Sequence, residues 1–174
     1  MKEILHVGLV PESAWYFNVR SILSVSEWDK IRKIIYQKAD YKCEICGGQG
    51  YKHLVEAHER WQYDEKKHIQ KLVNIVALCP VCHEATHIGF AGLRHKTEQS
   101  IQHIMKVNKW DRQQTLEHIK KAFDIWKDRS KIEWKLDLTY FLEQNFDLLE
   151  STKRTIKNSI NKNNFNKEVL KRAY

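Results

Sequence analysis

The order of apolar and polar residues predicts both helices and strands. In the first quarter of the chain, four apolar residues occur at helical spacing with basic residues between them: Trp28, Ile31, Ile34 and Ile35. This spacing predicts an amphipathic helix of about a dozen residues, which is an ordinary helix length. Ser26 and Asp29 have the spacing of a capping box, in which a hydroxyl and a carboxylate satisfy the first backbone amides.

Other segments favour extended structure. Residues 1–23 mix β-branched and aromatic residues and predict a short strand or extended segment. Residues 51–63 alternate loosely, residues 64–67 form a charged turn, and 69–78 are a second extended run. Aromatic residues in the first of these runs are expected to lie in the core. Residues 131–138 alternate cleanly and predict a half-exposed strand.

Helical spacing returns after the second extended run. A short helix is predicted to end at Gly89 and Gly92, because glycine is favoured just after a helix. Thr97 is predicted to cap the next helix, whose buried residues would be Ile101, Ile104 and Met105. Asp111 with Gln114 is predicted to cap a longer helix, with an inward stripe of Leu116, Ile119, Phe123 and Trp126.

All four cysteines form two Cys-x-x-Cys pairs, Cys43 with Cys46 and Cys79 with Cys82. Four thiolates at this spacing suit a tetrahedral Zn²⁺ with a closed coordination sphere, so we expect a structural zinc site. Two disulfides would require an oxidising compartment, for which the sequence shows no export signal. A redox switch is the weaker alternative, because zinc-bound thiolates should be inert until the metal leaves.

Length and charge refine this picture. The 174 residues predict a single domain over 1–150 and a basic tail or helix over 151–174. Seven lysines and arginines against one acid give that tail +6 of the total formal charge of +8, which favours a polyanionic partner. The N-terminal residues have neither signal-peptide nor membrane-span character, so we expect a cytoplasmic protein that does not enter a membrane.

Three residues fall in register with the cysteines: His58, Asn74 five residues before Cys79, and His83 directly after Cys82. This arrangement resembles the HNH endonuclease family over residues 41–90. The resemblance implies an α+β fold with a ββα-metal finger as its core, over 41–92. The finger would be stapled by the four-cysteine zinc and flanked by several helices and a short additional strand.

The resemblance also implies a role for each residue. His58 would be the general base, because an imidazole is partly neutral at working pH. His83 and His87, four residues apart, could ligate a divalent cation from one helix face. Asn74 would brace the loop that orients His58.

The family usually has a ligand immediately before the base, where this chain has Ala57. Glu56, Glu59 or His87 could replace it, and we favour His83 and His87 with help from one glutamate. In a second arrangement His58 is a ligand and Glu59 is the base. Imidazole ligands admit Mn²⁺, Ni²⁺ or Zn²⁺ as well as Mg²⁺.

The function that the resemblance implies is metal-dependent hydrolysis of DNA phosphodiester bonds, on double-stranded DNA, leaving a 5′-phosphate. The protein could act as a homodimer. The alternative is a zinc-ribbon module that binds nucleic acid or protein and has lost the chemistry, for which Ala57 is the best support. Five further histidines have no partner pattern and are expected to be ordinary: His53, His68, His95, His103 and His118.

Overall fold

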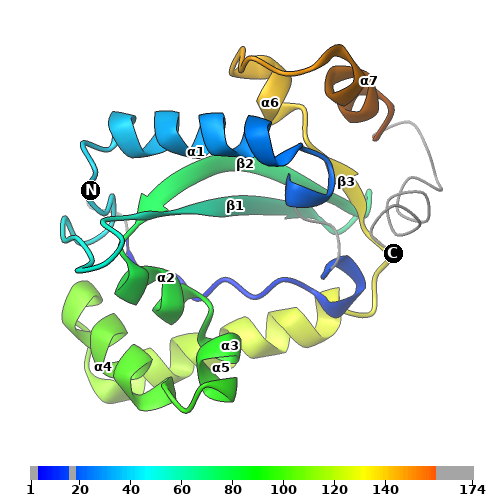
Figure 1. The fold of residues 1–174 in the computed structure, drawn as a ribbon. Coiled ribbons are helices and arrows are strands. Elements are labelled where there is room, and N and C mark those ends of the chain that lie inside the picture. The colour runs from blue at the N-terminus through cyan, green and yellow to red at the C-terminus, as the bar shows by residue number, and fades with distance from the viewer. Residues whose placement is uncertain (1–3, 16–18, 160–174) are drawn as a thin grey trace. The chain divides into compact units, whose positions relative to one another are not determined.

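The computed structural model describes residues 4–15 and 19–159 and has a mixed α+β fold (Figure 1). The predicted tail lies outside the described residues from position 160 onward. The elements in chain order are two 3₁₀ turns, η1 (Glu12–Ala14) and η2 (Val19–Ser21), then α1 (Val25–Lys38), β1 (Glu56–Asp64), β2 (Ile69–Leu78), α2 (Pro80–Thr86), α3 (Ile88–Leu93), α4 (Thr97–Asn108), α5 (Arg112–Arg129), β3 (Lys135–Asp137), α6 (Tyr140–Glu143) and α7 (Glu150–Ser159).

The three strands form one sheet in the order β1-β2-β3. A turn at residues 65–68 joins β1 to β2, and β3 pairs in parallel with the start of β2, with Gln70 opposite Leu136. The second strand has its predicted bounds. The first begins only at Glu56, so the prediction of a strand from residue 51 was wrong, and residues 51–54 are an exposed loop.

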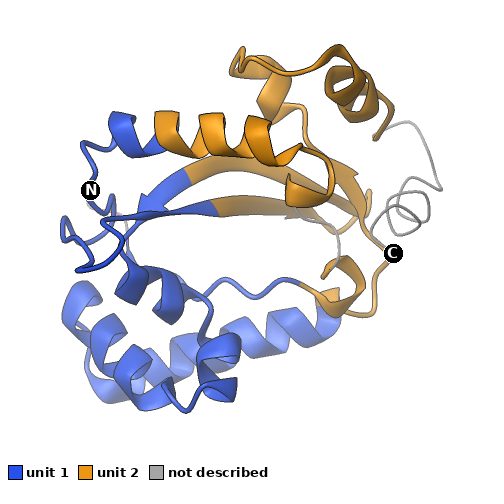
Figure 2. Ribbon diagram, in the orientation of Figure 1, with its two compact units in different colours: residues 1–10, 35–58, 76–128 blue, residues 11–34, 59–75, 129–174 orange. Residues whose placement is uncertain are grey.

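The contacts divide the chain into two compact units (Figure 2). Unit 1 comprises Met1–Val10, Ile35–His58 and Val76–Asp128, and unit 2 comprises Pro11–Ile34, Glu59–Ile75 and Arg129–Tyr174. Unit 1 therefore contains all four cysteines together with His58, His83 and His87.

The core of unit 1 is built around the cysteines. Fully buried side chains from the N-terminal segment, the first cysteine pair, β2, α2 and α4 meet in this core: Leu5, Ile45, Leu78, Cys82 and Ile104. Asn108 fixes the N-terminal segment, because its side chain accepts from the Leu5 amide at 2.7 Å and donates to the Leu5 carbonyl at 3.0 Å. Helices α2, α3 and α4 contact one another beside this core (Figure 1).

The helix boundaries of unit 1 differ from the prediction in two places. Helix α2 ends at Thr86 with His87 as its C-cap, and both glycines expected to end it, Gly89 and Gly92, lie inside α3. Thr97 is the first residue of α4 rather than its cap, and Lys96, which precedes it, makes no capping hydrogen bond with its side chain. The first difference follows from a break at His87, whose backbone leaves the helical region.

Helix α5 begins as predicted but buries a slightly different stripe. The Gln114 amide donates to Asp111 Oδ1 at 2.8 Å, and the Asp111 amide donates to Gln114 Oε1 at 3.0 Å, which is a reciprocal cap. Thr115 is buried, whereas Leu116 is 42% exposed, so the prediction for Leu116 was wrong. Ile119, one helical turn after Thr115, is partly buried and packs against the core of unit 1.

In unit 2 the capping box of α1 lies two residues earlier than predicted. Ser24 donates to the Glu27 carboxylate through its amide at 2.8 Å and its hydroxyl at 2.6 Å, and the Glu27 amide donates back to Ser24 Oγ. Glu27 also accepts from the Leu149 amide and the Thr152 hydroxyl at the start of α7. Asp29, the predicted member, pairs with Arg32 instead.

Glu27→Ala is expected to lower the free energy of unfolding by about 2–4 kcal/mol, because it removes a cap and leaves buried donors without an acceptor. Burial alone would raise the pKa of Glu27, but the hydrogen bonds from Ser24, Leu149 and Thr152 lower it below 4.5. The stabilisation is therefore complete above about pH 4.5 and is lost as the pH falls through the folded-state pKa.

Denaturant unfolding of the native and variant proteins at several pH values measures this effect. The control is Asp29→Ala on the same helix, whose exposed ion pair should contribute about 0.5 kcal/mol or less. Equal stability losses in the two variants would contradict the assigned role of Glu27.

Candidate metal centres

The four cysteine sulfurs converge in unit 1. All four are free thiols, and their sulfur atoms lie within 4.8 Å of one another. The sulfurs of Cys46 and Cys79 are 3.6 Å apart. A tetrahedral zinc with Zn–S bonds of about 2.3 Å requires sulfurs roughly 3.8 Å apart, so the cluster has the dimensions of a structural zinc site.

Local backbone structure prepares both cysteine pairs for a metal. In the first pair, the Cys43 amide donates to the Gly48 carbonyl, and Gly47 adopts a φ of +77°, which favours glycine. The Gly48 amide then donates to Cys46 Sγ at 3.3 Å. In the second pair, Cys79 caps α2 by accepting from the Cys82 amide at 3.5 Å. Amides directed at sulfur stabilise thiolates, which are the form that binds zinc.

Glu44 joins the first cysteine pair to the end of β2. Its amide donates to the Ala77 carbonyl at 2.9 Å, and its carboxylate accepts from the Ala77 amide at 2.7 Å. These bonds bring Cys43 and Cys46 beside Cys79, which follows two residues after Ala77. The four-cysteine cluster is thus fixed by backbone contacts as well as by the sulfurs.

The ionisation of the thiols fits a cation at the centre of the cluster. Hydrogen bonds from Cys79 and Cys82 hold the pKa of Cys43 far below its usual value. The same bonds to Cys43 raise the pKa of Cys79 to about 11 and that of Cys82 further. A second thiolate in this partly buried site would be repelled by the first. A cation among the sulfurs is therefore needed before all four thiols can be thiolates.

His103 of α4 is a neighbour of the cluster that the sequence did not indicate. Its Nε2 lies 3.1 Å from Cys82 Sγ. An imidazole donating to a metal-bound thiolate would draw off part of its charge and fix its orientation. His103 is therefore not the ordinary histidine expected from the sequence. The sequence spacing between Cys82 and His103 matches no metal-ligand motif. The packing of α2 on α4 brings the two side chains together.

A second cluster in unit 1 consists of three histidines. The ring centroids of His58 are 5.3 Å from His83 and 4.9 Å from His87, and those of His83 and His87 are 4.9 Å apart. One nitrogen from each ring lies within 4.8 Å of the other two. His58 lies on β1, His83 lies on α2, and His87 is the C-cap residue of α2. Three imidazoles at this spacing could hold a divalent cation.

Glu56 joins this cluster through His83. Its Oε2 is 2.5 Å from His83 Nδ1, which leaves Nε2 as the ring nitrogen for a ligand. Glu56 and His58 are two residues apart on β1 and so share one face of the strand. Ala57 alternates to the other face, and its amide donates to the Tyr36 hydroxyl at 3.2 Å. The Glu56 carboxylate thus fixes the orientation of the His83 ring.

The environment of His87 keeps its ring neutral. Burial, and to a smaller extent the neighbouring His83, lower the pKa of His87 to about 4. A neutral imidazole has a lone pair available for a metal at physiological pH. His58 is buried, at 7% exposure, whereas His83 and His87 are partly exposed.

Two predicted site residues have their described partners within unit 2. The Glu59 carboxylate accepts from the Val19 backbone and interacts with Trp61, and burial raises its pKa. Asn74 lies within β2, where its Oδ1 accepts from the Ile75 amide at 2.9 Å and from the Tyr140 hydroxyl at 3.4 Å. The structure thus gathers Glu56, His58, His83 and His87, and gives Glu59 and Asn74 these other partners.

The last observations concern membrane spans and similarity to known proteins. Within residues 4–15 and 19–159, no helix is both long enough and apolar enough to cross a membrane. The chain matches no protein-family model, no curated protein and no solved structure. The assignment of function therefore depends on the geometry of the two clusters.

Proposed function

We propose that the protein is a metal-dependent endonuclease of the HNH type that hydrolyses DNA phosphodiester bonds. The observation that carries the proposal is the convergence of His58, His83 and His87, with Glu56 bonded to His83. The four-cysteine cluster adjoins this site through Cys82, the residue before His83. In this proposal it would hold a structural Zn²⁺ and so position α2, in the manner of a ββα-metal finger.

His83 and His87 would hold the catalytic cation through ring nitrogens. His83 offers Nε2, since Glu56 occupies Nδ1. His87 is neutral because burial lowers its pKa, and it lies one helical turn after His83. Nitrogen ligands favour Mn²⁺, Ni²⁺ or Zn²⁺ over Mg²⁺. When bound, the cation would neutralise charge on the phosphate and on the departing oxygen.

His58 would act as the general base. Its ring lies beside both proposed ligands, so a water at the phosphate would be within reach of its nitrogen. The imidazole takes a proton from that water, the water oxygen forms a bond to phosphorus, and the bond to the 3′-oxygen breaks. A proton from solvent completes the 3′-hydroxyl, and the new strand end carries a 5′-phosphate.

Glu56 would orient His83 rather than bind the cation itself. Glu56→Gln is expected to weaken cation binding about 10- to 100-fold, because the charged acceptor on Nδ1 raises the basicity of Nε2. Titration of the zinc-loaded protein with Mn²⁺ measures the affinity. Glu98→Gln is the control, since Glu98 pairs with Arg112 on exposed parts of unit 1. Unchanged Mn²⁺ affinity in Glu56→Gln would contradict the orienting role.

The test of the function is incubation of the zinc-loaded protein with supercoiled plasmid and each candidate cation. The expected result is conversion to nicked or linear DNA whose ends carry 5′-phosphate. Cleavage should be faster with Mn²⁺ or Ni²⁺ than with Mg²⁺. Retention of DNA without cleavage under every cation would refute the nuclease and support the zinc-module adaptor, in which the cysteine cluster remains and the chemistry is lost.

A further inference from the structure

The loop that precedes β1 exposes an aromatic ring beside a lysine. Residues 51–54, which include His53, are all exposed, and Tyr51 is 102% exposed. Lys52 has no ion-pair partner among the described residues. Aromatic side chains bury a large apolar area when they are covered, so the fully exposed Tyr51 ring is available to stack on a partner. We call residues 50–54 the Tyr51 loop.

The base of the Tyr51 loop is fixed while its tip is free. The Gly50 amide donates to the Leu54 carbonyl at 2.9 Å and closes the loop. A Cβ at Gly50 would lie 2.1 Å from the His53 carbonyl oxygen and 2.6 Å from Pro80 Cδ, so only glycine fits. Val55, which directly follows the loop, is buried. Tyr51 is thus presented from a defined position.

The Tyr51 loop is attached to both elements that form the histidine cluster. Glu56, whose carboxylate bonds to His83, follows Val55 directly at the start of β1. Pro80, against which Gly50 packs, is the first residue of α2, which carries His83. The base of the Tyr51 loop therefore adjoins both elements that carry the histidines.

We propose that the Tyr51 loop contacts an unstacked nucleobase of the substrate. The Tyr51 ring would stack on the base, and Lys52 would contact a neighbouring phosphate. The inference rests on the proposed function for the identity of the polymer. It narrows the substrate to DNA with an unpaired or frayed base beside the cleaved bond, because a base inside a continuous duplex offers no free face to the ring.

The test measures binding of short labelled oligonucleotides by fluorescence anisotropy, using zinc-loaded full-length protein with His58→Ala to prevent cleavage. Adding Tyr51→Ala should weaken single-strand binding about 5- to 150-fold and blunt-duplex binding much less. Tyr51→Phe should retain the parent affinity, since the ring is kept. Zinc content and circular dichroism establish that each variant is folded.

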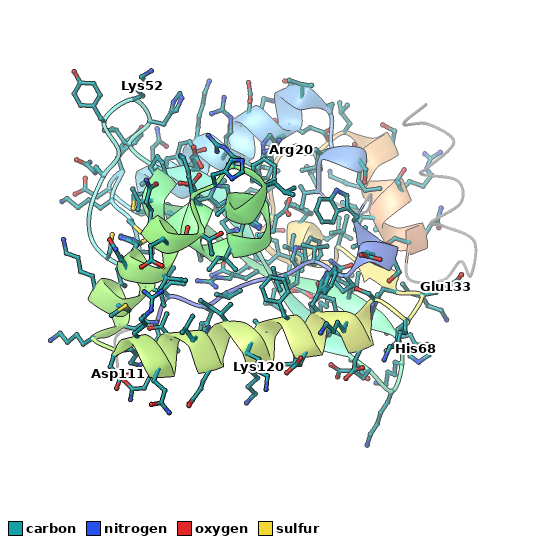
Figure 3. The ribbon with its side chains drawn as sticks, turned by 90° about the horizontal axis from the view of Figure 1, so that it is seen from below. Arg20, Lys52, His68, Asp111, Lys120 and Glu133 are labelled. Atoms are coloured by element: carbon teal, nitrogen blue, oxygen red, sulfur yellow. The ribbon has the colours of Figure 1, made fainter. Side chains whose placement is uncertain are left out.

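Lysine variants provide a matched pair for the phosphate contact. Lys52→Ala should weaken binding and reduce the slope of log affinity against log salt by about one. Lys120→Ala removes the same charge from α5 and should change neither quantity. Figure 3 shows Lys52 on its loop and Lys120 on α5, projecting from different parts of unit 1.

The outcomes separate this inference from the nuclease proposal. Single-strand affinity that is unchanged by Tyr51→Ala, or absence of oligonucleotide binding, would overturn the contact even if plasmid is cut. Binding that depends on Tyr51 in a protein that cuts no plasmid would support the contact and refute the nuclease.

Discussion

His58→Ala is expected to lower the rate of plasmid cleavage about 10²- to 10⁴-fold, the usual contribution of a general base. Zinc content and affinity for the second cation should stay near native values, because His83 and His87 still supply the proposed ligands. Plasmid conversion over time, with parallel metal analysis and Mn²⁺ titration, measures the three quantities together.

The control for His58→Ala is His95→Asn. His95 is exposed and adopts a positive φ of 57°, which asparagine also tolerates. This variant loses an imidazole from unit 1 without a change of backbone and should cleave at the native rate. Loss of Mn²⁺ binding in His58→Ala would show that His58 is a ligand. Glu59→Gln would then be the variant to assay for loss of the base.

Cys82→Ser is expected to abolish zinc binding and to unfold unit 1. Cys82 is completely buried in the core of that unit, and its sulfur belongs to the cluster that joins residues 43–46 to residues 79–82. Structural zinc contributes on the order of 10 kcal/mol to folding, which is comparable to the whole stability of a domain. Metal analysis should fall from about one zinc per chain to none, with loss of helical circular dichroism.

Gln49→Ala is the matched control for the cysteine variant. Gln49 lies in the same loop as Cys46, and its exposed side chain donates to the Tyr41 carbonyl. It should keep its zinc and its fold. A Cys82→Ser protein that lacks zinc yet keeps the native spectrum and melting temperature would show that the cluster does not stabilise unit 1.

Part of this structure followed directly from local sequence. The bounds of β2 were predicted because apolar runs of that length form buried strands, and Asp111 with Gln114 was predicted because a reciprocal cap needs only two residues at fixed spacing. The clustering of the cysteines followed from spacing too, since a tetrahedral ion accepts few arrangements.

Other parts depended on contacts between distant segments. Ser24 and Glu27 cap α1 in place of Ser26 and Asp29, because Glu27 also reaches the start of α7. The strand expected from residue 51 begins later, because the chain at Gly50 packs against Pro80. No local sequence pattern indicates either contact. The helix and strand boundaries that depend on these contacts therefore could not be predicted from local sequence.

The histidine cluster shows the same division. Its three members carried a recognisable pattern, whereas the function of Glu56 depends on the strand face that it shares with His58. Glu59 was a candidate by proximity in sequence, but alternation along β1 directs it toward Val19 and Trp61. Adjacent residues on a strand face opposite ways, so a carboxylate two residues from His58 was the better candidate.

The most direct test of the cation site is anomalous X-ray diffraction from crystals of the zinc-loaded protein soaked in Mn²⁺. The account predicts a zinc peak among the four sulfurs and a separate manganese peak in contact with His83 Nε2 and a ring nitrogen of His87. A single peak at the sulfurs, with the rings of His58, His83 and His87 turned away from one another, would contradict it.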